Sequence, residues 1–179
     1  MNLNDINPRM KPLPLPVWKK SCVTLMMPEK LSNGSIKFAK SGESYMRYEY
    51  RINEKERLIY QSFKGACCIG DLEIAILELT QDPNFNPDYD VLTDLRTCEF
   101  TFLPENLTSV VQMFKERFGE NTGTSALLVD TPIETVIAGE YQSMIGNGRE
   151  IHVFCTYEGA LDWLKRGVLP FDREWSFKM

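Results

Sequence analysis

The sequence has few of the residues from which metal sites and disulfide frameworks are built. It holds one histidine, His152, so a zinc site based on histidines is excluded. Its 5 cysteines include no Cys-x-x-Cys pair, and their odd number fits reduced thiols in the cytosol better than a disulfide framework. The sequence therefore predicts a cytoplasmic protein that has no metal site and needs no cofactor.

Long apolar runs and an excess of positive charge are also missing. No run approaches the roughly 18–20 apolar residues that span a bilayer, and the amino-terminal MNLNDINPRMK has no apolar core of the kind found in secretory signals. The formal net charge is −5, which disfavours binding to the phosphate backbone of nucleic acids. We therefore expect neither an integral membrane segment nor a nucleic-acid partner.

The chain of 179 residues suits one domain with an appendage. In the stretch KPLPLPVW, prolines alternate with apolar residues, which favours an extended, polyproline-like arm. Asn33-Gly34 is a turn signal between two short strand candidates. We predict an extended arm over residues 1–43, with a short hairpin as an addition, and one α/β domain over residues 44–179.

Within the predicted domain, strand and helix patterns alternate. Two alternating segments around Asn53–Glu56 predict a hairpin whose second strand is broken at Gly65. Apolar runs such as SALLVD are typical of strands buried on both faces of a parallel sheet. Further strands are predicted over 89–96, 125–130 and 150–155, with helices over 72–79, 104–118, 132–145 and 157–166. The order predicts a mainly parallel mixed sheet of four to five strands with right-handed crossovers.

Four local features accompany this order: the strand ending in Gly65, the loop QDPNFNPDYD, the strand VLTDLR, and the ending IHVFCTYEGALDWL. Together they resemble the STAS-like family, which includes bacterial anti-sigma-factor antagonists and their divergent relatives. The resemblance covers residues 45–168. It implies a STAS-like α/β fold and a regulatory or protein-interaction role in a bacterium, without catalysis.

The resemblance fails at the switch segment of that family. Signalling members carry aspartate–serine–serine–glycine at the start of the helix that follows the matching strand, and a kinase phosphorylates the serine. Here the segment reads TFLPENLTS, with Pro104 at the helix start. Thr101 and Ser109 are nearby hydroxyls, and a phosphate near a helix amino terminus is electrostatically favourable. They remain the candidate phosphorylation sites of a domain that lacks the serine motif.

Polar side chains at the predicted carboxyl ends of the strands are the candidates for binding a ligand or partner. Ligands of open α/β sheets usually bind there, which nominates Asp94, Arg96, Asp130 and Thr131. Asp94 and Arg96 share one side of a strand and together suit a polar or anionic ligand. The alternative is structural: Asp94 and Arg96 form an ion pair, and Thr131 caps a helix.

Two further functions remain open. Methionines and aromatic residues suit a binder of a small apolar or lipid-like ligand. Asp94 and Asp130 are the one pair of carboxylates that suggests acid–base catalysis. An enclosed apolar cavity of roughly 300 Å³ would favour ligand binding, whereas a solid core with an exposed apolar patch would favour a protein partner or self-association.

Overall fold

The computed structural model describes residues 29–30, 35–37, 46–119, 123–146 and 149–165. Most of the predicted arm, including the proline-rich stretch and the Asn33-Gly34 turn, lies outside these residues. The arm, and the boundary at residue 44, therefore stay predictions.

The described elements follow one another as strands and helices from residue 29 to residue 163. They are β1 (Glu29–Lys30), β2 (Ser35–Lys37), β3 (Arg47–Asn53), β4 (Leu58–Cys67), α1 (Ile69–Gln81), β5 (Asp90–Phe100), the 3₁₀ helix η1 (Pro104–Leu107), α2 (Thr108–Phe118), β6 (Thr124–Leu128), α3 (Pro132–Ile145), β7 (Glu150–Phe154) and α4 (Tyr157–Trp163). Within the part of the chain that the structure describes, no helix has the length and apolar character needed to cross a membrane.

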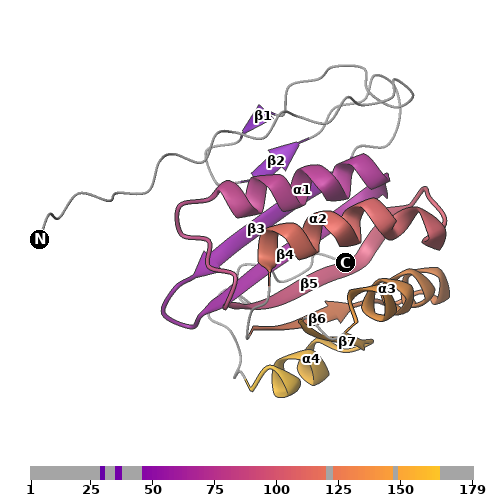
Figure 1. The fold of residues 1–179 in the computed structure, drawn as a ribbon. Coiled ribbons are helices and arrows are strands. Elements are labelled where there is room, and N and C mark those ends of the chain that lie inside the picture. Colours follow the sequence, from indigo (N-terminus) through magenta and orange to yellow (C-terminus); the bar gives the residue numbers. More distant parts are fainter. Residues whose placement is uncertain (1–28, 31–34, 38–45, 120–122, 147–148, 166–179) are drawn as a thin grey trace, which may run out of the picture.

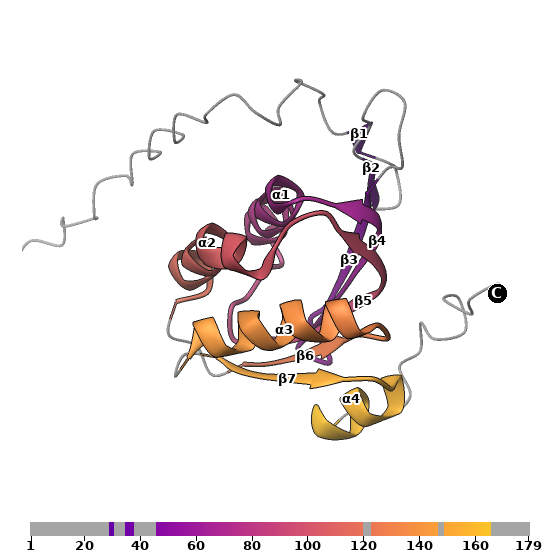
Figure 2. The same ribbon diagram turned by 90° about the vertical axis from the view of Figure 1, so that its right-hand side faces the viewer.

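All strands join one sheet, in which the spatial order is the order along the chain. The pairs from β1 to β4 are antiparallel, and those from β4 to β7 are parallel. Helices α1, α2 and α3 cover one face and α4 covers the other (Figure 1, Figure 2). The predicted α/β class and the mixed sheet are confirmed. Five strands, β3 to β7, form its main body, and two short strands extend it beyond β3.

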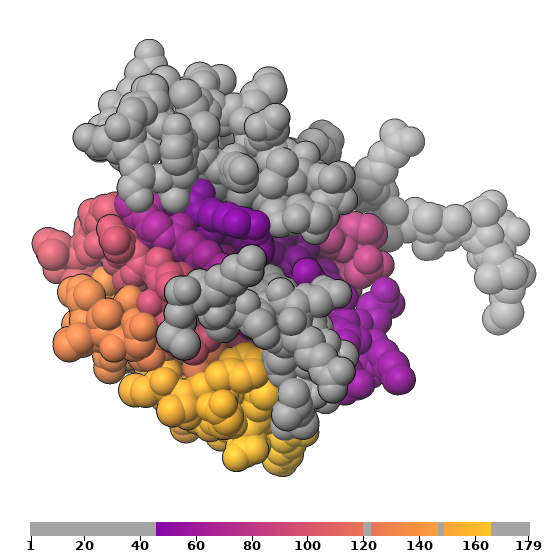
Figure 3. All heavy atoms as spheres, turned by 180° about the vertical axis from the view of Figure 1, so that it is seen from behind, coloured from indigo at the N-terminus to yellow at the C-terminus, as the bar shows by residue number. Residues whose placement is uncertain are grey.

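Two apolar clusters lie on the two faces of this sheet, because side chains alternate along each strand. The larger one packs the sheet against α1, α2 and α3 and includes the fully buried Tyr48 and Ile59. The smaller one packs α4 against β4, β5 and β6 through Leu92, Leu128 and Leu161. Figure 3 shows the molecule from behind, with the yellow atoms of the α4 region at the bottom of the view.

The start of α3, predicted at residue 132 with Thr131 as a possible cap, is confirmed in detail. Thr131 accepts a hydrogen bond on its hydroxyl oxygen from the backbone N–H of Glu134, and the Glu134 carboxylate accepts one from the backbone N–H of Thr131. Pro132 occupies the first helical position, where its missing N–H costs nothing. These local contacts explain why the helix begins where the sequence predicts it.

Two strand ends were predicted wrongly. Strand β4 continues through Gly65, which has a φ of 81°, and ends at Cys67. Strand β5 continues past Arg96 to Phe100. Ser62 pairs with Asp94 and Lys64 with Thr97, so one residue of β4 faces two of β5. Such a bulge increases the local twist, and glycine is common at irregular strand positions. Strand β4 is therefore longer than predicted from Gly65, and β5 is longer than predicted from Arg96.

Candidate functional site

Three of the four predicted binding residues lie together, although not at the end of strand β5. Strand β6 pairs with β5 only as far as Asp94, opposite Leu128, so β5 loses this neighbour at Asp94. Arg96 lies just beyond, within β5, and its guanidinium is close enough to Asp130 to feel its charge. Asp94, Arg96 and Asp130 thus form a polar cluster where β6 ends. The expectation that Asp94 and Arg96 follow their strand was wrong, because β5 goes on pairing with β4 as far as Phe100.

Within this cluster Asp94 is buried and fully engaged. Arg96 donates from Nε to Oδ1 at 3.0 Å and from its terminal nitrogen to Oδ2 at 2.8 Å, a bidentate ion pair. Its backbone N–H also donates to Oδ1, at 3.2 Å, and the Tyr60 hydroxyl donates to Oδ2, at 3.3 Å. Hydrogen bonding to Asp94 raises the pKa of Arg96, and burial and the Asp94 charge raise the pKa of Tyr60. The structural ion pair proposed as the alternative is therefore present.

Asp130 and Thr131 have different surroundings from Asp94. The backbone N–H of Asp130 donates to Glu134 at 2.9 Å, while its side chain is exposed. Thr131 is the N-cap of α3, as the structural alternative predicted. The Asp94 carboxylate is therefore bound by the Arg96 guanidinium, whereas the Asp130 carboxylate is exposed to solvent. That arrangement differs from two carboxylates that converge on a substrate, so it offers no support for acid–base catalysis.

The two candidate phosphorylation sites also differ from each other. Thr101 directly follows β5, and its hydroxyl donates to the carbonyl oxygen of Cys67 at 3.1 Å. Ser109 is exposed at the second position of α2. A phosphate on Thr101 would break the bond that ties it to β4, whereas one on Ser109 would project into solvent. Both residues are exposed, and the Thr101 hydroxyl is already hydrogen-bonded to Cys67, so phosphorylation of either residue stays a prediction.

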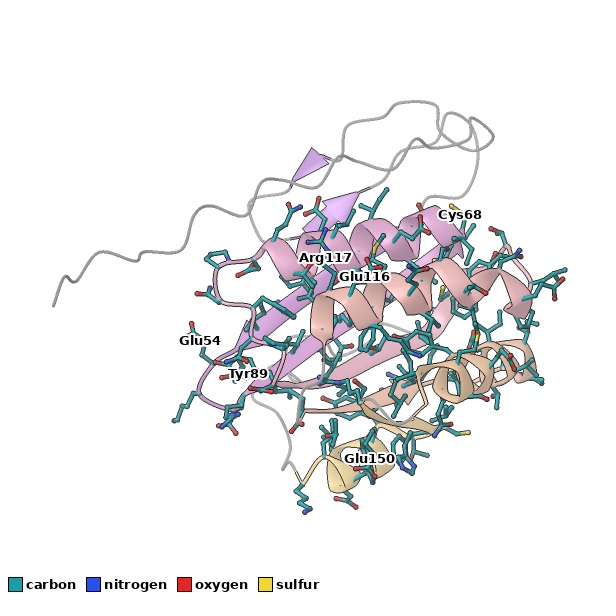
Figure 4. The ribbon with its side chains drawn as sticks, in the orientation of Figure 1. Glu54, Cys68, Tyr89, Glu116, Arg117 and Glu150 are labelled. Atoms are coloured by element: carbon teal, nitrogen blue, oxygen red, sulfur yellow. The ribbon has the colours of Figure 1, made fainter. Side chains whose placement is uncertain are left out.

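The adjacent cysteines Cys67 and Cys68 lie in the turn that leads from β4 into α1. Cys67 ends β4 and Cys68 is the N-cap of α1, at the end of that helix labelled in Figure 4. A hydrogen bond with Cys98, followed by burial, raises the pKa of Cys67. Burial, followed by a side-chain hydrogen bond with Asp71, raises the pKa of Cys68. Because thiolates are the reactive form, both cysteines are poor nucleophiles near neutral pH.

A buried arginine that the sequence reading did not single out joins three segments. Arg149 is 3% exposed and donates from Nε to the hydroxyl oxygen of Ser125. Its terminal nitrogens donate to the carbonyl oxygens of Pro87 at 2.9 Å and Thr124 at 2.8 Å, and to that of Tyr89. Burial lowers its pKa to about 10, so it stays protonated at neutral pH. Figure 4 shows Tyr89 near the β3–β4 turn that carries Glu54. Arg149 thus holds the approach to β5 against the start of β6.

A cavity lies between the sheet and helices α1, α2 and α3, where a small-ligand binder would have its pocket. Its volume is about 90 Å³, and its lining is mainly apolar. Gln61, Thr93 and Ser125, from the adjacent strands β4, β5 and β6, contribute polar side chains. The one signal for it in the sequence is that these three residues interrupt apolar strands on the helix-covered face. Pockets for drug-sized ligands start at roughly 300 Å³, so this cavity suits a much smaller molecule than a lipid.

Comparison with known proteins gives a match among solved structures but none among family models or curated proteins. Among solved structures, the chain is similar to an uncharacterized protein of the DUF3478 family with a SpoIIAA-like fold from Shewanella loihica PV-4. The two share 15% identity with a TM-score of 0.45, over 71% of this chain and 99% of the other. SpoIIAA-like denotes the STAS-like arrangement. The likeness concerns fold alone and assigns no activity to either protein.

Replacement of Asp94 by asparagine tests whether the polar cluster is structural. We expect Asp94→Asn to lower the free energy of unfolding by about 1–2 kcal/mol, because Arg96 and Tyr60 lose a charged acceptor. Urea unfolding followed by circular dichroism measures the change. Asp162→Asn, at an exposed position of α4, is the control and should stay within about 0.5 kcal/mol of the parent. A stabilised Asp94→Asn variant would contradict this reading and indicate a site strained for binding.

Proposed function

We propose that this protein is a non-catalytic regulatory or protein-interaction domain, carried by residues 44–179, that works without the phosphorylatable serine motif. The observation that supports this proposal is a group of exposed large apolar side chains at one edge of the fold. Leu103, Ile133 and Val136 are 60%, 54% and 56% exposed. We call these three residues the edge patch. Exposed apolar residues that gather in one place are typical of surfaces that bind other proteins.

The edge patch comes from two segments that the topology brings together. Strands β5 and β6 are parallel, so their carboxyl ends point to the same edge of the sheet. Leu103 lies between β5 and η1, Ile133 and Val136 lie in the first two turns of α3, and η1 contacts α3. Ile133 and Val136 are three residues apart and therefore neighbours on the helix surface. The edge patch thus extends from η1 onto the exposed side of α3.

The charge around the edge patch suggests the chemistry of its partner. Glu105, Asp130 and Glu140 are exposed on the same segments. Protein interfaces combine an apolar centre with a polar rim of complementary charge. We therefore expect a protein partner that presents apolar side chains flanked by lysine or arginine. A second copy of this chain is the alternative partner, because self-association through a two-fold axis would use the same surface twice.

Site-specific photo-crosslinking in the native cell tests this function. With benzoylphenylalanine in place of Val136, we expect one defined crosslinked species, whose mass identifies a partner protein or a second copy. The additional change Ile133→Asp should reduce the yield at least tenfold, because a charge is introduced into the apolar contact.

The matched control places the same crosslinker at Gln112, which is exposed on α2 outside the edge patch. This position should give no defined species. Unfolding of the Ile133→Asp variant should stay within about 0.5 kcal/mol of the parent, because the residue is exposed. Equal crosslinking from Gln112, or a yield that Ile133→Asp leaves unchanged, would refute an interaction through the edge patch.

A further inference from the structure

The cavity under the helices combines an apolar wall with a polar floor. Phe114 and Phe118 of α2 and Tyr141 of α3 line it on the helix side. The two phenyl rings are stacked at 4.1 Å, and Tyr141 meets Phe114 edge-on at 5.9 Å. On the sheet side, Thr93 and Ser125 are 5% and 4% exposed and come from neighbouring strands. The cavity therefore has aromatic walls and two buried hydroxyl groups.

The hydrogen bonds of these two hydroxyls leave their protons available. Thr93 accepts at Oγ1 from the side-chain amide of Gln61 at 2.7 Å, and Ser125 accepts at Oγ from Arg149. Among the described residues, neither hydroxyl donates to a protein acceptor. Each hydroxyl carries one donor proton besides its lone pairs. On the sheet side of the cavity, the hydroxyls of Thr93 and Ser125 can therefore donate hydrogen bonds to a ligand oxygen, while the remaining lining is largely apolar.

The surroundings and the volume of the cavity limit the charge and the size of a ligand that it can hold. The Arg149 guanidinium already donates to the carbonyl oxygens of Pro87, Tyr89 and Thr124, so it is not available to neutralise a buried anion. A carboxylate in this apolar site would lose hydration without a partner. A volume of about 90 Å³ is smaller than the roughly 150 Å³ cavity known to hold benzene, so the ligand has no more than about six heavy atoms.

From this geometry we infer that the cavity binds a small, neutral, flat molecule with one carbonyl oxygen, such as a cyclic ketone, ester or lactone. The ring lies against Phe114 and Phe118, and the oxygen accepts from the Thr93 or Ser125 hydroxyl. This site is distinct from the edge patch, because Ile137 and Ala138 of α3 line the cavity while Ile133 and Val136 are exposed. A change at the edge patch therefore leaves the cavity intact.

Cyclopentanone and its oxygen-free analogue methylenecyclopentane test the inference on the full-length protein by NMR titration. For cyclopentanone we expect a dissociation constant on the order of 1 mM, as suits six heavy atoms, with intermolecular NOEs to Thr93 and Phe114. Methylenecyclopentane should bind about tenfold more weakly. Of the variants Thr93→Val, which has nearly the same shape, and Ser125→Ala, the one that removes the donating hydroxyl should abolish most of this difference while retaining hydrocarbon binding.

Xenon, which needs only apolar space, reports separately on the cavity itself. Ala138→Val should abolish the binding of xenon and of both organic probes by filling the cavity, and Ile133→Asp should change none of them. Equal affinity for the ketone and the hydrocarbon would refute the role of the hydroxyl donors. Xenon binding without any binding of the ketone would refute the ligand class, even where a Thr93 variant fails to fold.

Discussion

Replacing Arg149 by methionine is expected to lower the free energy of unfolding by roughly 3–4 kcal/mol. Methionine keeps most of the side-chain length but leaves the carbonyl oxygens of Pro87, Tyr89 and Thr124 without their donor. Buried acceptors that lose a charged partner each cost about 1–3 kcal/mol, and such contacts are not independent. Because domains of this size have stabilities of roughly 5–15 kcal/mol, the loss is large. Urea unfolding monitored by circular dichroism measures it.

The same substitution on the surface provides the control. Arg117 is exposed near the end of α2 (Figure 4), and Arg117→Met should change the stability by less than about 0.5 kcal/mol. Arg149→Lys should fall between the two, because a single ammonium group cannot reproduce a planar fork of donors. If Arg149→Met were as stable as Arg117→Met, the proposed role of Arg149 in holding β5 to β6 would be wrong.

Gly123→Ala is expected to lower the free energy of unfolding by roughly 2–3 kcal/mol, because the added methyl group would overlap with the surroundings of the Arg149 guanidinium. A Cβ atom at position 123 would lie 2.5 Å from the carbonyl oxygen of Tyr89 and 2.8 Å from both terminal nitrogens of Arg149. Neither neighbour can move without breaking the hydrogen bonds of the guanidinium. Thermal and urea unfolding should both show the loss.

Gly139→Ala is the matched control, since it makes the same chemical change where space exists. Gly139 lies inside α3, and a Cβ atom there meets nothing within 4 Å. Alanine has the better helix propensity, so this variant should gain about 0.5–1 kcal/mol. If Gly123→Ala lowers the free energy of unfolding and Gly139→Ala raises it, the result supports the close packing of Tyr89 and Arg149 against Gly123. A Gly123→Ala variant that is neutral or stabilised would show that the chain relaxes there at little cost.

The local signals in the sequence predicted the element types well. Pro104, Gly119 and the Thr131 capping box mark helix boundaries that the structure confirms. Each acts through neighbours within a few residues: a missing N–H at a helix start, a φ of 64° at a helix end, a hydroxyl three residues from its donor. Contacts of this range are encoded in adjacent residues, which is why pattern reasoning finds them.

Contacts between distant residues were not predictable in this way. Arg149 follows a helix in the sequence and resembles a surface charge there, yet it bonds to residues 60 and 62 positions earlier. The bulge in β5 depends on how two parallel strands share hydrogen bonds, and no residue of VLTDLR signals it. For the same reason, Asp94 and Arg96, which form the ion pair of the structural alternative, were placed at the wrong point of their strand.

The sequence alone thus determined the α/β class, the order of strands and helices, and the caps, because periodicity and capping are local properties. It also determined the pairing of Asp94 with Arg96, since residues two apart share one side of a strand. Only the tertiary structure decided that Arg149 is buried, that η1 lies against α3, and that Thr93 and Ser125 share a cavity. Each of these depends on the register of parallel strands, which is set by packing across the whole sheet.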